Sequence, residues 1–322
     1  MDKTVILCPG QGAQVVGMGR DVAETYDSAR QVYARADEIL GMDLGRLCFE
    51  GPAEQLNRTS TSQPAIFVTS VAIWSALESE GVAAAWAPGV VAGLSLGEYT
   101  ALHIAGMLDF ESCLRLVAER GRLMQEASDA VPSGMVSVMG LDEPTMNELC
   151  REAAGGEVLA PANFNCPGQI VVSGSQAACE RLRQAVESQG GRSVALSVAG
   201  AFHSALMGSA ADGLTGSLAR AQFTPGRIPV VSNVSADYHG DADGVRALLR
   251  EQVIKPVRWQ ASMERLISDG FNRFFELGPG RVLSGLMRKI DRSVEMKNIS
   301  TATGIEKEST AASVGVTHDP SH

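Results

Sequence analysis

Short apolar runs alternate with longer amphipathic stretches over residues 1–127. A continuous apolar run of about four to eight residues is typical of a strand buried on both faces, whereas apolar residues spaced at the helical period indicate a helix. The runs at 4–8 and 89–95 therefore predict buried strands. Helices are expected at 20–40, 64–81, 96–108 and 110–127. Strands that alternate with helices in this way predict a parallel sheet covered on both faces.

The rhythm changes after about residue 128. The predicted strands and helices now follow the order strand–helix–strand–strand–helix–strand, which is that of a ferredoxin-like unit. The strands are expected at 135–140, 158–165, 169–175 and 192–198, and the helices at 143–154 and 176–190. We therefore expect a small ferredoxin-like subdomain at 128–197, inserted into a larger catalytic domain that comprises 1–127 and 198–300.

After residue 198 the alternation of strands and helices seen in residues 1–127 resumes, and it ends near residue 300. The segments 228–236 and 271–279 predict further strands. The helix predicted at 281–290 ends in two basic residues, as a helix C-terminus prefers. Residues 301–322 are polar, small and aperiodic, so they predict a flexible C-terminal tail.

Composition narrows the class of protein. With 45% hydrophobic and 20% charged residues, the chain can bury a substantial core. Its net charge of −10 argues against general binding to nucleic acid, which needs a basic surface. The six cysteines are scattered without a C-x-x-C pair, which indicates reduced, buried thiols and no zinc site. The first apolar run is too short for a signal peptide, and no run is long enough to span a bilayer, so a cytoplasmic protein is expected.

The sequence GLSLG at 93–97 fits the pattern G-x-S-x-G between a predicted strand and a predicted helix. Bulky flanking residues would collide with that strand and helix in a sharp turn, and the turn would lift the Ser95 hydroxyl above the sheet edge. The simpler alternative is a serine that caps the following helix. The strand and helix on either side favour a nucleophile, and the expected fold class is α/β with a large α/β-hydrolase-like parallel-sheet domain.

A nucleophilic serine needs a base, and His203 is the preferred candidate. It follows a predicted strand and opens a helical pattern, which places it at a sheet edge. His103 lies on the predicted helix after Ser95 and is expected to pack there, and His239 lies in the polar loop DYHGD, where exposure is expected. No acidic residue close in sequence to His203 suggests itself as a third member, so a backbone carbonyl is a candidate to hold the imidazole.

A second glycine cluster, PGQGAQ at 9–14, follows the first predicted strand. The dinucleotide pattern G-x-G-x-x-G fails here, because Val15 stands at the position of the third glycine or alanine. The phosphate-loop pattern is absent as well. A better use of this loop is donation of the Gln11 main-chain N–H to an oxyanion.

Seven motifs that occur in order resemble one enzyme family over nearly the whole chain up to about residue 300. They are PGQGAQ (9–14), TSQPAIF (61–67), GLSLGEY (93–99), ERGRLMQ (119–125), ANFNCPGQIV (162–171), AGAFHSALM (199–207) and ELGPGRVL (276–283). The sequence is similar to the malonyl-CoA:acyl carrier protein transacylases of bacterial fatty acid synthesis. The resemblance implies an acyltransferase that passes a malonyl group from malonyl-CoA to a carrier protein by a ping-pong mechanism.

The same resemblance implies roles for individual residues. Ser95 matches the nucleophile that accepts the malonyl group, and His203 matches its base. Gln252 matches the residue whose main-chain carbonyl holds that histidine, which would explain the missing carboxylate. Gln11 and Leu96 match the residues whose amides form the oxyanion hole.

Further matches concern the substrate. Arg120 matches the arginine that grips the malonyl carboxylate, Gln63 matches a polar residue of the pocket, and Phe202 resembles the malonyl-selective form of its motif. The alternative for the arginine is a surface residue paired with a neighbouring glutamate. One departure is Leu94, because the family commonly has a histidine directly before the serine.

The implied partner is an acidic acyl carrier protein, and an acidic chain needs a local basic patch to bind it. Candidate residues are Lys255, Arg258, Arg281, Arg288 and Lys289. No metal or redox cofactor is expected. Two other classes remain open at this point: a serine hydrolase with the same nucleophile turn, which would have no use for a buried cation, and a catalytically silent protein that only docks carriers.

Overall fold

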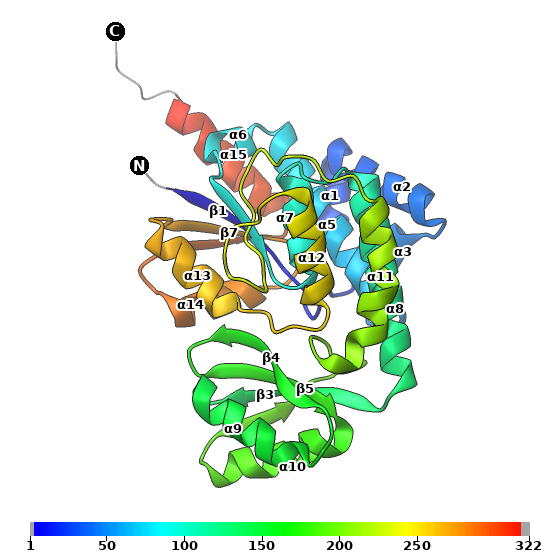
Figure 1. Cartoon of the computed structure of the whole chain (residues 1–322). Coiled ribbons are helices and arrows are strands. Elements are labelled where there is room, and N and C mark those ends of the chain that lie inside the picture. Colours follow the sequence, from blue (N-terminus) through cyan, green and yellow to red (C-terminus); the bar gives the residue numbers. More distant parts are fainter. Residues whose placement is uncertain (1–2, 317–322) are drawn as a thin grey trace.

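A parallel four-stranded sheet forms the centre of the larger part of the molecule (Figure 1). The computed structural model describes residues 3–316. The strand order is β2-β1-β7-β8, with all neighbours parallel. The strands are β1 (Thr4–Cys8), β2 (Val90–Gly93), β7 (Arg273–Leu277) and β8 (Glu295–Ile299). The parallel sheet expected from the apolar runs is confirmed.

Helices cover both faces of this sheet. Successive side chains of a strand point to opposite faces, so neighbouring residues pack against different sets of helices. In β1, Ile6 belongs to the large core with the helices of one face, whereas Val5 and Leu7 belong to a second core with the helices of the other. The second core includes α13 (Trp259–Ser268) and α14 (Val282–Ile290). The remaining helices of this part are α1 (Arg20–Thr25), α2 (Asp27–Leu40), α3 (Leu44–Glu50), α4 (Ala53–Leu56), α5 (Thr59–Ser79), α6 (Val82–Trp86), α7 (Leu96–Ile104), α8 (Phe110–Ala130), α11 (Gly208–Arg220) and α12 (Ala242–Gln252), with a 3-10 turn η1 at Ala205–Met207.

A separate antiparallel sheet has the order β4-β5-β3-β6. Its elements are β3 (Ser133–Met139), α9 (Glu143–Ala154), β4 (Leu159–Cys166), β5 (Gln169–Ser175), α10 (Gln176–Ser188) and β6 (Arg192–Ala195). This confirms the predicted strand–helix–strand–strand–helix–strand order, and the two helices share a third apolar core with the sheet. The elements lie within the segment 128–197, although α8 continues to Ala130. The division into domains at 128 and 197 stays a prediction.

The strand predicted at 228–236 is wrong. Only Val230 bridges to β2, through Val91, and Val231 then bridges to Tyr238. The chain turns away from the sheet edge because the N–H of Ser232 donates to the carbonyl of Asp237 at 2.9 Å. The apolar run therefore forms the start of a tight loop and not a full strand.

The flexible tail predicted at 301–322 is also wrong for most of its length, because α15 occupies Ala302–Val316. Ile305 is fully buried, Ala302 is nearly so, and Lys297 donates to the Glu308 carboxylate at 3.0 Å. The residues between these positions are mostly small or polar, so the sequence shows no apolar periodicity that would predict this helix. Residues 317–322 lie outside the described part. Between residues 3 and 316, no helix is both long and apolar enough to cross a membrane.

Candidate active site

Ser95 occupies a strained turn between β2 and α7. Its backbone has φ 52° and ψ −105°, a conformation that non-glycine residues rarely adopt. A Cβ on Gly93 would lie 1.9 Å from the carbonyl carbon of Gly97, and a Cβ on Gly97 would lie 2.1 Å from the carbonyl oxygen of Cys8. Both glycines of the motif are therefore required by close backbone contacts, as the sequence predicts. The serine stands at the N-cap position of α7, but its side chain makes no capping hydrogen bond.

The Ser95 hydroxyl faces a buried imidazole. Its Oγ lies 2.8 Å from Nε2 of His203, and the Nδ1 of His203 lies 2.6 Å from the main-chain oxygen of Gln252. A carbonyl oxygen only accepts, so Nδ1 carries the proton. The lone pair of Nε2 then points at the serine hydroxyl, which is the tautomer that a base needs.

The imidazole is held neutral by its surroundings. Burial lowers the pKa of His203 to about 4, and the nearby positive charge of Arg120 acts in the same direction. Hydrogen bonds to the main chain at Gln252 and Lys255 oppose the shift without cancelling it. The histidine is therefore able to accept a proton over the whole neutral range.

Arg120 lies inside the molecule, with 1% of its surface exposed. One guanidinium nitrogen donates to Oε1 of Gln63 at 2.7 Å, and another donates to Oγ of Ser95 and to Oε1 of Gln252, both at 2.9 Å. Within residues 3–316 no carboxylate forms an ion pair with it, and burial lowers its pKa. The predicted surface alternative does not apply: its neighbour Arg122 makes the ion pairs with Glu119 and Glu126.

These groups open into one cavity of about 240 Å³. Most of the predicted site residues line it: Gln11, Gln63, Ser95, Arg120, Phe202 and His203. Leu94, the departure from the family pattern, lines it as well, whereas Gln252 lies behind the histidine and does not. Leu96 is fully buried and does not, but it is the first residue of α7, and the first N–H groups of a helix have no partner within it. The other wall comes from the antiparallel sheet, through Met135, Ser137, Asn163 and Val171. A buried cation and a serine–histidine pair at the end of a small cavity can hold an acyl group that carries a negative charge.

Three residues around the nucleophile were missed by the sequence reasoning. Asn233 accepts the Ser95 N–H at 2.5 Å, and Glu98 binds Asn233, Gln252 and His239. His239 was expected to be exposed, but its side chain is only 1% exposed because it is folded against Glu98. The one available signal was the position of Glu98 directly after the G-x-S-x-G pattern.

The five candidate docking residues are all exposed: Lys255, Arg258, Arg281, Arg288 and Lys289. Three of them lie on or next to α14, whose Val282 and Leu286 line the cavity. All six cysteines are free and buried, as predicted. Over the described range 3–316 no group of histidine, cysteine and acidic side chains is placed to hold a metal ion.

Comparison with known proteins identifies the family of the chain. The model of the acyl transferase domain family matches residues 5–317. The malonyl CoA-acyl carrier protein transacylase of Escherichia coli K12 is 41% identical over 291 residues, which are 90% of this chain and 93% of that protein. The solved transacylase of Clostridium perfringens has a TM-score of 0.91 at 36% identity and covers 98% of this chain and 99% of its own.

A second solved structure is a malonyl-transacylase in complex with a type II PKS acyl-carrier protein. It has a TM-score of 0.92 at 38% identity, and the match covers 96% of this chain and 100% of that one. With this identity over nearly the full length of its relatives, the chain belongs to the malonyl-CoA:acyl carrier protein transacylase family of acyl transferases.

Proposed function

We propose that the protein transfers the malonyl group of malonyl-CoA to the phosphopantetheine thiol of an acyl carrier protein, for fatty acid or polyketide chain elongation. The observation that carries the proposal is the meeting of Ser95, His203 and Arg120 in one small cavity. The family membership supports the same reaction.

In the first half of the reaction, His203 Nε2 takes the Ser95 proton and the serine oxygen attacks the thioester carbon of malonyl-CoA. The carbonyl oxygen becomes an oxyanion. When the carbonyl re-forms, the carbon–sulfur bond breaks and the coenzyme A sulfur receives the proton from His203. The product is a malonyl ester on Ser95.

In the second half, the carrier thiol gives its proton to His203 and its sulfur attacks the ester carbon. The bond to Ser95 breaks, and the serine oxygen recovers the proton. The main-chain carbonyl of Gln252 keeps the imidazole in the required tautomer through both halves. Neither half-reaction requires a metal ion or a redox cofactor.

The oxyanion of each half needs two donors, and the main-chain amides of Gln11 and Leu96 are the candidates. Gln11 lines the cavity beside the serine, and Leu96 is the first residue of a helix whose positive end points at the site. Loss of one such donor typically costs roughly 2.7–4 kcal/mol of transition-state stabilisation.

Arg120 gives the site its preference for an acyl group with a free carboxylate. In the malonyl ester a single methylene separates the carboxylate from the ester carbonyl, so its cation must lie next to the nucleophile. The guanidinium nitrogen 2.9 Å from Ser95 Oγ satisfies this condition. Hydrogen bonds to charged groups are worth roughly 1.5–3 kcal/mol, which is about ten- to a hundredfold in preference over an acetyl group. Gln63 accepts a hydrogen bond from the guanidinium, and Phe202, which lines the pocket, would restrict the space for a branched acyl group.

The carrier protein would approach over α14, which lines the mouth of the cavity and presents its basic residues to solvent. Lys289 donates to Gln169, which also lines the cavity. Arg281 directly precedes the same helix and Arg288 lies in its last turn, with Lys255 and Arg258 preceding α13. An acidic carrier fits this patch despite the negative net charge of the whole chain.

Mass spectrometry after exposure to malonyl-, methylmalonyl- and acetyl-CoA tests the function. We expect a malonyl adduct on Ser95 that disappears when a carrier protein is added, and no adduct in Ser95→Ala. Arg120→Ala should lose the malonyl preference far more than acetyl turnover. Rapid release of free malonate without transfer would indicate a hydrolase, and the absence of any adduct would indicate a silent docking protein.

A further inference from the structure

A fully buried carboxylate lies next to the nucleophile turn and has no role in the chemistry described above. Glu98 belongs to the first turn of α7 and is 0% exposed. One carboxylate oxygen accepts the N–H of Asn233 at 3.0 Å and Nε2 of Gln252 at 2.8 Å, and the other lies 2.7 Å from Nε2 of His239. A carboxylate is costly to bury without hydrogen-bond donors around it, and these three contacts supply them.

Two of its partners hold the main chain of the nucleophile. The side chain of Asn233 accepts the N–H of Ser95 at 2.5 Å and donates to the carbonyl of Gly93 at 2.7 Å. The side chain of Gln252 donates to the carbonyl of Ser95 at 2.9 Å. A strained backbone persists only where its surroundings over-determine it. Both main-chain groups of Ser95 are thus held by side chains of residues that Glu98 binds, Asn233 through its main-chain N–H and Gln252 through its side-chain amide.

The carboxylate also decides how the Gln252 amide is turned. A carboxylate only accepts hydrogen bonds, so the NH₂ group of Gln252 must face it. The amide oxygen is then left to accept from Arg120, which it does at 2.9 Å. Glu98 therefore orients the residue whose side chain contacts the cation and whose main chain contacts His203.

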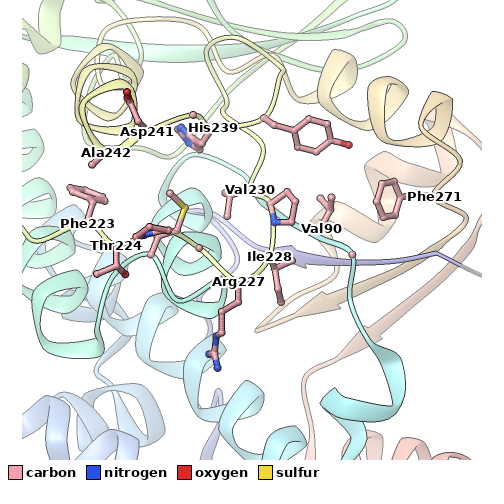
Figure 2. Close-up of a pocket in the computed structure, with 17 residues that line it drawn as sticks. Val90, Phe223, Thr224, Arg227, Ile228, Val230, His239, Asp241, Ala242 and Phe271 are labelled. Atoms are coloured by element: carbon pink, nitrogen blue, oxygen red, sulfur yellow. The ribbon is translucent and has the colours of Figure 1, made fainter.

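His239 reaches Glu98 from a second cavity of about 740 Å³ (Figure 2). This cavity and the acyl cavity have no lining residue in common. Nδ1 of His239 has no hydrogen-bond partner between residues 3 and 316, and a carboxylate only accepts, so the Nε2–H is the group that donates to Glu98. His239 lies outside the acyl cavity, and its side chain is connected to the nucleophile through Glu98.

We propose that Glu98 and His239 are positioning residues for the nucleophile. His239 fixes the Glu98 carboxylate, and the carboxylate fixes the main chain of Asn233 and the side chain of Gln252, the two residues whose side chains hold Ser95. This rests on the proposed function in one respect, that Ser95 is the reacting group. A shift of the serine by a fraction of an ångström would then slow acylation without weakening the binding of malonyl-CoA.

The test measures two rates on the full chain: labelling of Ser95 by a fluorophosphonate, and coenzyme A release in a single turnover with malonyl-CoA. Glu98→Gln keeps the shape of the side chain but removes one acceptor. We expect both rates to fall about 10- to 100-fold while the malonyl-CoA concentration for half-maximal rate changes by less than about threefold. Circular dichroism and thermal melting check that the variant is folded.

A second pair of variants keeps the test decisive if Glu98→Gln does not fold. His239→Leu removes the donor to Glu98 and should slow both rates, whereas His239→Gln retains an amide N–H and should restore most of the loss. Tyr238→Phe is the matched control, because it breaks the 2.6 Å hydrogen bond from the same loop to Asp269 without touching Glu98. We expect it to react at the parent rate.

The two proposals fail in different ways. Parent-like rates in folded Glu98→Gln and in His239→Leu overturn the positioning role. An equal loss in His239→Leu and Tyr238→Phe also overturns it, since loosening of the loop would then explain both. A parent protein that reacts with the fluorophosphonate but not with malonyl-CoA contradicts the proposed function alone, and the labelling rates still decide the role of Glu98.

Discussion

At the scale of single residues, Ser95 and His203 share an unusual backbone. Their φ angles are 52° and 56°, although neither is a glycine. Positive φ in non-glycine residues is uncommon and clusters where surrounding contacts over-determine the conformation. Gln252 contacts both residues, because its carbonyl accepts from Nδ1 of His203 and its side-chain amide donates to the carbonyl of Ser95. The pair is therefore fixed before substrate arrives.

The fall of activity at acidic pH depends on the burial of His203. His203 works as a base only when neutral, so activity falls as the pH drops through its pKa, which burial lowers to about 4. We expect kcat/KM for malonyl-CoA to stay level down to about pH 5 and then to fall about tenfold per pH unit below the pKa. Initial rates across this range, with circular dichroism at each pH, measure it. A midpoint near the ordinary histidine value of about 6.5 in folded protein would contradict the buried, cation-adjacent base.

Sequence reasoning found the residues that carry chemistry more readily than those that hold them. Ser95, His203 and Arg120 lie in motifs that are recognisable over a few positions. Glu98 meets its partners 135 and 154 residues further along the chain, so no local pattern connects them. Only the folded chain brings these groups together. From sequence alone, a polar residue in a loop, such as His239, is expected at the surface.

At the scale of elements, the apolar patterns predicted most helices and strands, but one run formed no strand and one helix showed no such pattern. The βαββαβ order of 133–195 and the parallel strands β1, β2 and β7 could be predicted because their apolar runs are continuous. The segment 228–236 has a similar run but is turned away from the sheet by its own hydrogen bonds. In α15 the buried face consists of few apolar side chains, so its helix gave no periodic signal.

The basic residues of α14 are expected to act in one half-reaction only. Charge reversal in Arg288→Glu and Lys289→Glu should raise the KM for the carrier protein about tenfold or more, because an acidic partner would meet like charges. The rate of acylation by malonyl-CoA should not change, and the difference should shrink at high salt. Stopped-flow acylation and steady-state transfer separate the two halves.

The control is Arg46→Glu on α3, an exposed residue that makes a local ion pair with Asp43. The helix α3 lies on the opposite side of the view from α14 (Figure 1). It alters the net charge of the chain by the same amount as either single reversal. If Arg46→Glu raised the carrier KM as much as Arg288→Glu, general charge and not the α14 surface would govern docking.

At the scale of the whole molecule, the acyl cavity depends on both sheets. The parallel-sheet part supplies Ser95, His203 and Arg120, and the antiparallel sheet supplies the opposite wall with Met135 and Val171. Chemistry and enclosure thus come from different segments of the chain. This arrangement keeps the charged groups in a site of low polarity, where their interactions are stronger than in water.

Substitutions in the C-terminal helix α15 should change the stability of the protein without changing its catalytic rate. Ile305 is 0% exposed and belongs to the same core as the sheet and the helices around it, but none of residues 302–313 of α15 lines the acyl cavity. Ile305→Ala should lower the free energy of unfolding by about 2–5 kcal/mol and leave kcat unchanged at temperatures where the protein is folded. The exposed Lys307→Ala on the same helix should change stability by less than about 0.5 kcal/mol. Denaturant unfolding of both variants measures the difference, and equal stabilities would mean that α15 does not pack on the core as described.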